Sequence, residues 1–559
     1  MTAARNLAPL LLAGWLAGCA APLPAPREPL ADADYHIFMG ELALARGQNH
    51  VAVDEYRDAA TRLADPAIAR RGMMIAVHAD DLAAARELVA RWAELAPGDT
   101  ELPRFRAMLA LRAGESEEAY AHFLRMTAAP NPELVAANLQ AVTGMLAGEE
   151  NIWRAADLMA RLAAARSQYA EAWHGAAMLA LEADRPAAAR QFATRALAIR
   201  PELEDLRFLQ ARAALLENPA ATEAEKRRIL APFERYRHHS DNGLRYRFGG
   251  LLTLADFNEE ADAVFADILL ADPTQHDARM ARALLAIDAG RLDDAETELH
   301  RLVINNARLQ DALYYLGAVR EASGDYEAAV QWYSRVAPEQ QPQRWLLAQA
   351  AIARIILRQE GPEAAGAYFD ELRKQWPEQA VLLTAHEASL LIAEGDPVFA
   401  LTRIDDLAGR FDTAGRDLDW QIAVAAAESG RLEQAERSFR SLLERDPRHP
   451  MLQNALGYLF IEQPGREEEA EALLLDALQA APANPAVLDS VGWLRAQQGR
   501  LEEARRLLEE SWLRAPAPIT GQHLLTTLYA IGDTASADAL RQEVERKFPG
   551  LGLTTTDSR

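Results

Sequence analysis

The feature that most constrains the fold is a 34-residue repeat near the C-terminal end of the sequence. Its last copy has small residues and a proline at intervals of 12, 7 and 5 residues: Gly492, Ala504, Ser511 and Pro516. The preceding copy, residues 457–482, shows the same order with one additional residue in its turn. Apolar residues recur at helical spacing between these positions, which predicts two helices joined by a turn. One such hairpin cannot bury its apolar face alone, so neighbouring copies must stack.

The same spacing recurs through most of the chain. From Gly40 to Gly492, the small residue of the first helix returns in steps of 32 to 38 residues. This pattern resembles the tetratricopeptide repeat. The resemblance implies an all-α fold, a right-handed α-solenoid of about fifteen helical hairpins over residues 35–549. An irregular basic insertion near residues 213–248 and a flexible tail at residues 550–559 complete the expected layout.

The N-terminal residues have the layout of a secretory signal. Residues 1–18 contain Arg5, an apolar run and a small-residue end, and the run is too short to span a bilayer. The segment from Leu16 to Cys19 resembles the lipobox of bacterial lipoproteins. That resemblance implies cleavage between Gly18 and Cys19 and acylation of this cysteine, with palmitate among the acyl chains. The alternative is a plain signal peptide with an incidental cysteine.

A proline-rich segment follows the predicted anchor. Residues 19–34 contain four prolines, which favour an extended polyproline geometry and a stiff spacer. Ala20, rather than an aspartate, follows the cysteine. In bacterial lipoproteins this pattern implies sorting to the outer membrane, and the default orientation is toward the periplasm. We therefore expect a chain tethered to the membrane by lipid and not spanning it.

The charge distribution contains one unusual region. The formal net charge of −24 disfavours nucleic acid as a partner. Within this acidic chain, the stretch from residue 226 to residue 247 is rich in cations, and its candidate partner-binding residues are Arg235, Arg237, Arg245 and Arg247. One interpretation is a docking patch for an acidic partner or an anionic polymer. The other is a helix whose arginines pair with carboxylates of neighbouring repeats.

No catalytic motif is present in the sequence. Zinc-protease, nucleophile-elbow, Walker and dinucleotide-binding patterns are all absent. The sole cysteine is assigned to lipid, and the histidines show no metal-ligand spacing. The sequence therefore predicts a protein that is not an enzyme, without a metal, a cofactor or a small-molecule substrate.

The function expected instead is the recognition of other proteins. The first helix of each hairpin should line the concave face of the solenoid, and helical phase places four candidate residues there: Asn454, Tyr458, Asp489 and Trp493. An aromatic ring beside an amide or a carboxylate would hold an extended peptide by stacking and hydrogen bonding. The alternative is that both rings are partly packed core with a polar rim.

Taken together, these features resemble outer-membrane tetratricopeptide lipoproteins of Gram-negative bacteria. The layout is similar to that of lipoprotein adaptors of periplasmic carboxyl-terminal processing proteases, which carry a PDZ domain and a serine nucleophile. The resemblance implies a scaffold that binds such a protease and its substrates, cell-wall hydrolases, and promotes the assembly and activity of the protease. The alternative is a structural lipoprotein of an envelope secretion, pilus or exopolysaccharide export machine.

Overall fold

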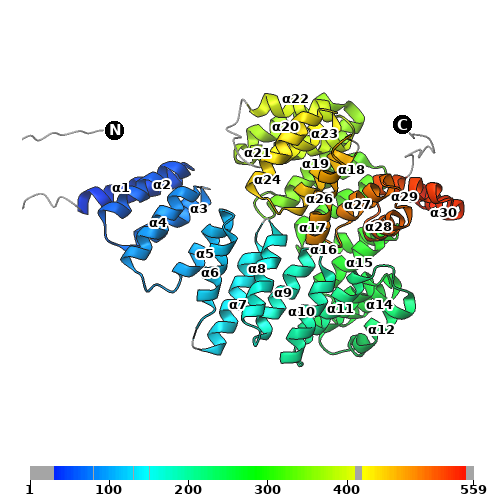
Figure 1. The fold of residues 1–559 in the computed structure, drawn as a ribbon, viewed down its shortest axis with the longest axis horizontal. Coiled ribbons are helices and arrows are strands. Elements are labelled where there is room, and N and C mark those ends of the chain that lie inside the picture. The colour runs from blue at the N-terminus through cyan, green and yellow to red at the C-terminus, as the bar shows by residue number, and fades with distance from the viewer. Residues whose placement is uncertain are drawn as a thin grey trace, which may run out of the picture. The chain divides into compact units, whose positions relative to one another are not determined.

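The computed structural model describes residues 30–79, 81–129, 131–149, 151–408, 418–461 and 463–548, and every regular element in these ranges is a helix (Figure 1). Their thirty α-helices pair into fifteen hairpins, which confirms the predicted all-α solenoid. The predicted signal, the cleavage position Gly18, the lipidated Cys19 and the tail at residues 550–559 lie outside the described residues.

Contacts divide the chain into two compact units, residues 1–122 and 123–559, with the division inside a helix. The first unit contains α1 (Leu30–Ala45), α2 (Asn49–Arg62), α3 (Pro66–His78), α4 (Leu82–Leu95), α5 (Leu102–Arg112) and the start of α6 (Ser116–Met126). Helix α1 begins inside the predicted spacer of residues 19–34, so that boundary was wrong. The reason is that no proline follows Pro29 until α3, and nothing prevents a helix from Leu30 onward.

The second unit contains the remaining helices, of which α12 continues into a 3-10 helix. Its α-helices up to the middle of the chain are α7 (Pro132–Ala147), α8 (Ile152–Ala165), α9 (Ala170–Glu182), α10 (Pro186–Ile199), α11 (Glu204–Glu217), α12 (Glu223–Leu230), α13 (Asn242–Leu254), α14 (Asn258–Ala271), α15 (His276–Asp288), α16 (Leu292–Ile304), α17 (Leu309–Ala322) and α18 (Tyr326–Tyr333). They are followed by α19 (Pro342–Glu360), α20 (Pro362–Gln375), α21 (Ala380–Ala393), α22 (Pro397–Ala408), α23 (Asp419–Glu428), α24 (Leu432–Arg445), α25 (Pro450–Ile461), α26 (Glu467–Ala480), α27 (Pro485–Gln497), α28 (Leu501–Arg514), α29 (Pro518–Ile531) and α30 (Thr534–Lys547). The 3-10 helices are η1 (Ala231–Tyr236) and η2 (Pro377–Gln379).

Small residues set the distance between the two helices of a hairpin. A Cβ atom on Gly492 of α27 would lie 2.7 Å from Cγ of Leu508 on α28. The preceding hairpin is built in the same way, since a Cβ on Gly457 would lie 2.7 Å from Cγ of Leu474. Any larger residue would push these helices apart, which is why the spacing of small residues predicts the hairpins.

In the second unit the hairpins stack so that first helices contact first helices. Helix α7 contacts α9, α9 contacts α11, α17 contacts α19, and α25 contacts α27, which contacts α29. These helices therefore line the inner side of the curved stack in the second unit. The turns inside hairpins follow one edge of the stack, and the connections between hairpins follow the opposite edge.

The expected insertion near residues 213–248 is a modified repeat. The second helix of this hairpin is short, because α12 ends at Leu230 and η1 takes over up to Tyr236. Thr222 caps α12 in a capping box with Glu225. Phe233 and Tyr236 of the 3-10 segment pack against Phe208 of α11, with ring centroids 4.9 and 5.4 Å away. The apolar contacts of a second helix are thus preserved, and the irregularity within residues 213–248 is the 3-10 segment of this repeat.

Candidate protein-binding face

The four candidate residues near the C-terminal end lie on two neighbouring first helices. Asn454 and Asp489 occupy equivalent positions of α25 and α27, and Tyr458 and Trp493 follow one helical turn later. The next first helix, α29, contributes His523 at the corresponding position, which the sequence interpretation missed. We call these five residues the inner-face cluster.

His523 is at the centre of the inner-face cluster. Its Nδ1 lies 3.1 Å from Oδ2 of Asp489, and both side chains are buried. The indole of Trp493 stacks on its imidazole, with ring centroids 4.3 Å apart and an interplanar angle of 10°. Tyr458, which is 39% exposed, lies with its ring centroid 6.3 Å from the imidazole. The predicted residues are therefore brought together by a histidine from the third helix.

Asn454 leaves one polar atom unsatisfied. The residue is only 7% exposed, and its Oδ1 has no hydrogen-bond partner in the described part of the chain. A buried acceptor without a donor costs about 1–3 kcal/mol. An amide N–H of a bound polypeptide, or a water that such a polypeptide displaces, would remove that cost.

The arginines of the basic region are already paired. Arg235 donates to Glu204 of α11 at 3.0 Å, and Arg247 donates to Asp205 of the same helix. Arg237 donates to Glu234 and also, at 2.7 Å, to Glu260 of the next hairpin. Arg245 is 7% exposed and donates to the backbone carbonyl of Arg237 at 3.3 Å.

Arginines of the basic region lower the pKa of a neighbouring carboxylate. A hydrogen bond from Arg227, together with one from Arg237, holds the pKa of Glu260 below its ordinary value. The guanidinium of Arg227 also lies 3.7 Å from the ring centroid of Phe257. Carboxylates of neighbouring helices thus pair with Arg235, Arg237 and Arg247 of the basic region.

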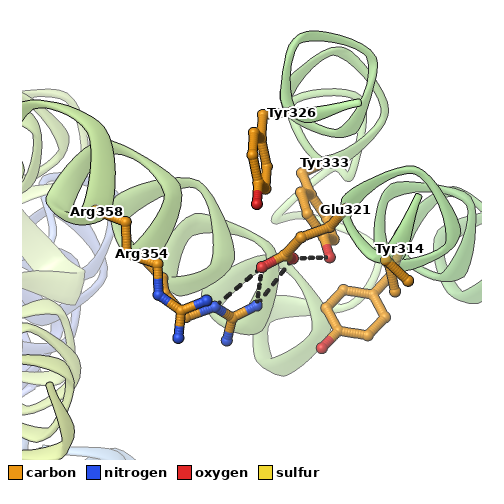
Figure 2. A pocket seen from close by; sticks show the side chains of 8 residues that line it. Tyr314, Glu321, Tyr326, Tyr333, Arg354 and Arg358 are labelled. Carbon is orange, nitrogen blue, oxygen red and sulfur yellow. Dashed lines mark hydrogen bonds and ion pairs between the residues drawn. The ribbon is translucent and has the colours of Figure 1, made fainter. Parts of the chain in front are cut away.

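A separate pocket opens between α17, α18 and α19, and Figure 2 shows its side chains. Its volume is about 400 Å³. Glu321 accepts a hydrogen bond from Tyr333 at 2.9 Å and three from Arg354 at 3.1, 2.8 and 2.9 Å. Burial, reinforced by the Glu321 carboxylate, raises the pKa of Tyr333. Arg358 on the rim donates to Glu394 at 2.8 Å. The ionised groups are therefore matched, and the pocket offers tyrosine faces rather than a reactive group.

The described residues contain neither a metal-binding cluster nor a membrane-spanning helix. No group of three or more histidine, cysteine, aspartate or glutamate side chains in these ranges is placed to hold a metal ion. Within the same ranges, each helix is too short or too polar to cross a bilayer.

Comparison with known families agrees with the repeat geometry. Residues 280–345 and 421–485 match the family model described as tetratricopeptide repeat. The chain carries tetratricopeptide repeats. The first matched segment contains Tyr314, Glu321 and Tyr333 of the pocket, and the second contains Asn454 and Tyr458 of the inner-face cluster. Stacked tetratricopeptide repeats form extended binding surfaces, which indicates a scaffold for protein–protein interaction.

Comparisons with curated sequences and with solved structures do not place the chain in a narrower family. No curated protein sequence matches the chain. A tetratricopeptide repeat protein from Parabacteroides merdae ATCC 43184 is 16% identical, with a TM-score of 0.33, and the match covers 45% of this chain and 98% of that chain. Yeast Tom70 is 14% identical, with a TM-score of 0.36 and coverage of 92% and 96%. The fold assignment rests on the two matched segments and on the hairpin geometry.

Proposed function

We propose that the chain is a lipid-anchored periplasmic scaffold whose tetratricopeptide repeats bind a carboxyl-terminal processing protease and its substrates, the cell-wall hydrolases. The lipid on Cys19 would fix the chain at the outer membrane, and the proline-rich segment would give it reach. Two proteins held on one solenoid meet at a raised effective concentration, so the scaffold promotes their reaction without a catalytic group of its own.

The observation that carries the binding part of this proposal is the unsatisfied Oδ1 of Asn454. It lies in the same row as Asp489 and His523, beside the rings of Tyr458 and Trp493. An extended peptide would donate a backbone N–H to Asn454 and lay an apolar side chain against the rings. A catalytic role has no comparable support, because the buried His523 is stacked under Trp493 and held by Asp489.

Affinity capture from envelope extract tests the proposed partner. The bait is the chain with Cys19→Ser, and a matched bait carries Asn454→Leu in addition, which removes the acceptor at nearly constant volume. We expect the first bait to recover a PDZ-containing serine protease and the second to recover several-fold less. Recovery of a secretin or a polysaccharide-export pore in place of the protease would contradict the proposed partner. Equal recovery on both baits would contradict the proposed role of Asn454.

Metabolic labelling tests the proposed anchor. Cys19 is the only cysteine in the chain, so a clickable palmitate analogue should label the wild-type protein and leave Cys19→Ala unlabelled. A second pool of wild-type protein, grown without the analogue, should remain with the membranes after a carbonate wash. Labelling of Cys19→Ala, or no labelling of the wild type, would contradict lipidation at this residue.

A further inference from the structure

Three sets of polar contacts join parts of the second unit that are about 300 residues apart in the sequence. The bonded residues are separated by 295, 295, 300 and 298 positions. Each contact brings the end of a first helix, or the turn after it, against the end of a second helix or the connection that follows. Figure 1 shows the helices on the two sides, α8–α11 in cyan and green and α24–α28 in yellow and orange. We call this row of contacts the seam.

The first contact of the seam involves the N-cap of α8. Oδ1 of Asn151 accepts a hydrogen bond from the backbone N–H of Arg154 at 2.9 Å. Its Nδ2 remains free for the other side and donates to Oδ2 of Asp446 at 2.5 Å. The ring of Trp153 meets the ring of His449 edge-on, with centroids 5.2 Å apart. Asn151 is 3% exposed, so this contact is enclosed.

The second and third contacts repeat this arrangement one and two hairpins further along. At the second contact, Asp184 accepts hydrogen bonds from the backbone N–H of Ala483 at 3.2 Å and from Nδ2 of Asn484 at 3.0 Å. Arg185 donates to the carbonyl of Ala480 at 2.5 Å. At the third contact, Arg514 donates to the carbonyl of Leu216 at 2.9 Å.

The order of these contacts along the two sides of the seam shows which part of the stack the seam closes. Moving by one hairpin on one side, from Asn151 to Asp184, corresponds to moving by one hairpin on the other, from Asp446 to Asn484. Turns inside hairpins and connections between hairpins lie on opposite edges of the stack. A seam that pairs the two edges in register means that the stack between them makes one complete superhelical turn.

We propose that the seam is a reversible clasp that holds the second unit as a closed turn and lets it widen when released. The seam is built mainly from carboxamide, carboxylate, guanidinium and backbone groups, which water can satisfy after separation. Neighbouring hairpins, in contrast, share apolar clusters such as the one formed by Leu474, Val487, Leu488 and Val491. Opening the seam therefore exposes polar groups, while opening a hairpin interface would expose core.

The clasp bears on how partners reach the inner face of the second unit. First helices line that face, and two of those that carry the inner-face cluster, α25 and α27, adjoin the connections that form the seam. A closed superhelical turn limits the width of a partner that can reach the inner face. Release of the clasp would admit a wider partner. The existence of the clasp itself does not depend on the proposed function, because it concerns contacts within this chain.

Two substitutions weaken the first and second contacts of the clasp while keeping the helix caps. Asn151→Asp and Asn484→Asp retain the Oδ1 acceptors that cap α8 and α27, because aspartate caps helices as well as asparagine does. Each substitution replaces a donor by a carboxylate facing a second carboxylate, that of Asp446 or Asp184. The matched control is Asn131→Asp, the same change at the N-cap of α7 and away from the seam.

Distances between spin labels provide the readout. In the full chain with Cys19→Ser, spin labels at the exposed positions Ala187 and Gln479 measure a distance across the seam. Spin labels at Ala187 and the exposed Ala220 measure a distance between neighbouring hairpins on one side of the seam. We expect a narrow 187–479 distribution in the parent and in Asn131→Asp, and a longer, broader one in Asn151→Asp/Asn484→Asp, with 187–220 unchanged throughout.

Two results would overturn the proposal. A broad 187–479 distribution already in the parent would mean that the seam is not closed in solution. A distribution that stays narrow and unshifted in the double variant would mean that these contacts do not hold the turn. Helix content from circular dichroism, measured on the same samples, separates release of the clasp from unfolding.

Discussion

The basic region and the inner-face cluster differ in how well their polar groups are satisfied. In the basic region, Arg235, Arg237 and Arg247 each have a carboxylate partner. In the inner-face cluster there are few charges, yet the buried Oδ1 of Asn454 has no donor among the described residues. In this protein, the region that is dense in charged side chains is therefore one whose charges are already neutralised by partners within the chain. An unmatched buried acceptor beside exposed aromatic area is the better indication of a binding face.

The largest expected effect is on partner binding by Trp493→Ala. The substitution removes the ring that stacks on His523 and that would contact a bound peptide. We expect the affinity for the protease recovered by affinity capture to fall by about thirtyfold, which corresponds to about 2 kcal/mol. Titration calorimetry measures the change, and Trp493→Phe, which retains a ring, should restore most of it. Unchanged affinity in a folded Trp493→Ala variant would contradict the inner-face cluster as the binding face.

Most of the inner-face cluster could be predicted from the sequence, because the repeat period fixes which side of each helix a residue occupies. Small residues such as Gly457 and Gly492 gave the register that places Asn454 beside Asp489. His523 was missed because the last hairpin has Thr526 where the two preceding hairpins have glycine, so the register was not extended to α29. Adding 34 residues to Asp489 would have located it.

The seam could not be predicted in that way. It depends on a small rotation between successive hairpins that accumulates from α8 to α28 and on where the two edges then meet. No local pattern around Asn151 or Asp446 differs from that of an ordinary helix cap or an ordinary connection. The ion pairs of the basic region could be predicted only in part. The repeat period predicts that a neighbouring repeat lies beside each arginine, but it does not predict which carboxylate that arginine contacts.

The second effect in size concerns stability in the basic region. Glu260→Gln leaves Arg227 and Arg237 without their shared carboxylate, and we expect the free energy of unfolding to fall by about 1.5 kcal/mol at pH 7. The pKa of Glu260 is lowered in the folded chain, so its stabilising contribution is complete above the unfolded value near 4.5. That contribution is lost as the pH falls through the lower folded value.

The pH dependence gives this prediction its control. Urea unfolding of the wild type and Glu260→Gln should differ most at pH 7, and the difference should shrink below pH 4.5. A difference that stays constant down to pH 3 would show that the glutamine disturbs packing and does not simply remove a charge.

A smaller effect separates satisfied from unsatisfied asparagines. Asn454→Ala removes an acceptor that has no donor, whereas Asn138→Ala in α7 removes a donor that bonds to the carbonyl of Met126 at 2.6 Å. Both gain the same helix propensity, so we expect Asn454→Ala to be more stable than Asn138→Ala by about 1 kcal/mol. Thermal and urea unfolding measure this difference. If both variants lose the same stability, Asn454 has a partner in solution, and its value as an indication of a binding face disappears.

The smallest effect is expected for Arg247→Ala. The side chains of Arg247 and Asp205 are 45% and 63% exposed, and exposed ion pairs contribute about 0–1 kcal/mol. Stability should therefore change by no more than about 0.5 kcal/mol, and capture of the protease should equal that of the wild type. If Arg247→Ala kept its stability but lost the partner, its guanidinium would be exchanging Asp205 for a carboxylate of that partner. Paired arginines would then be able to form a docking site, and the satisfaction of polar groups would no longer distinguish the two regions.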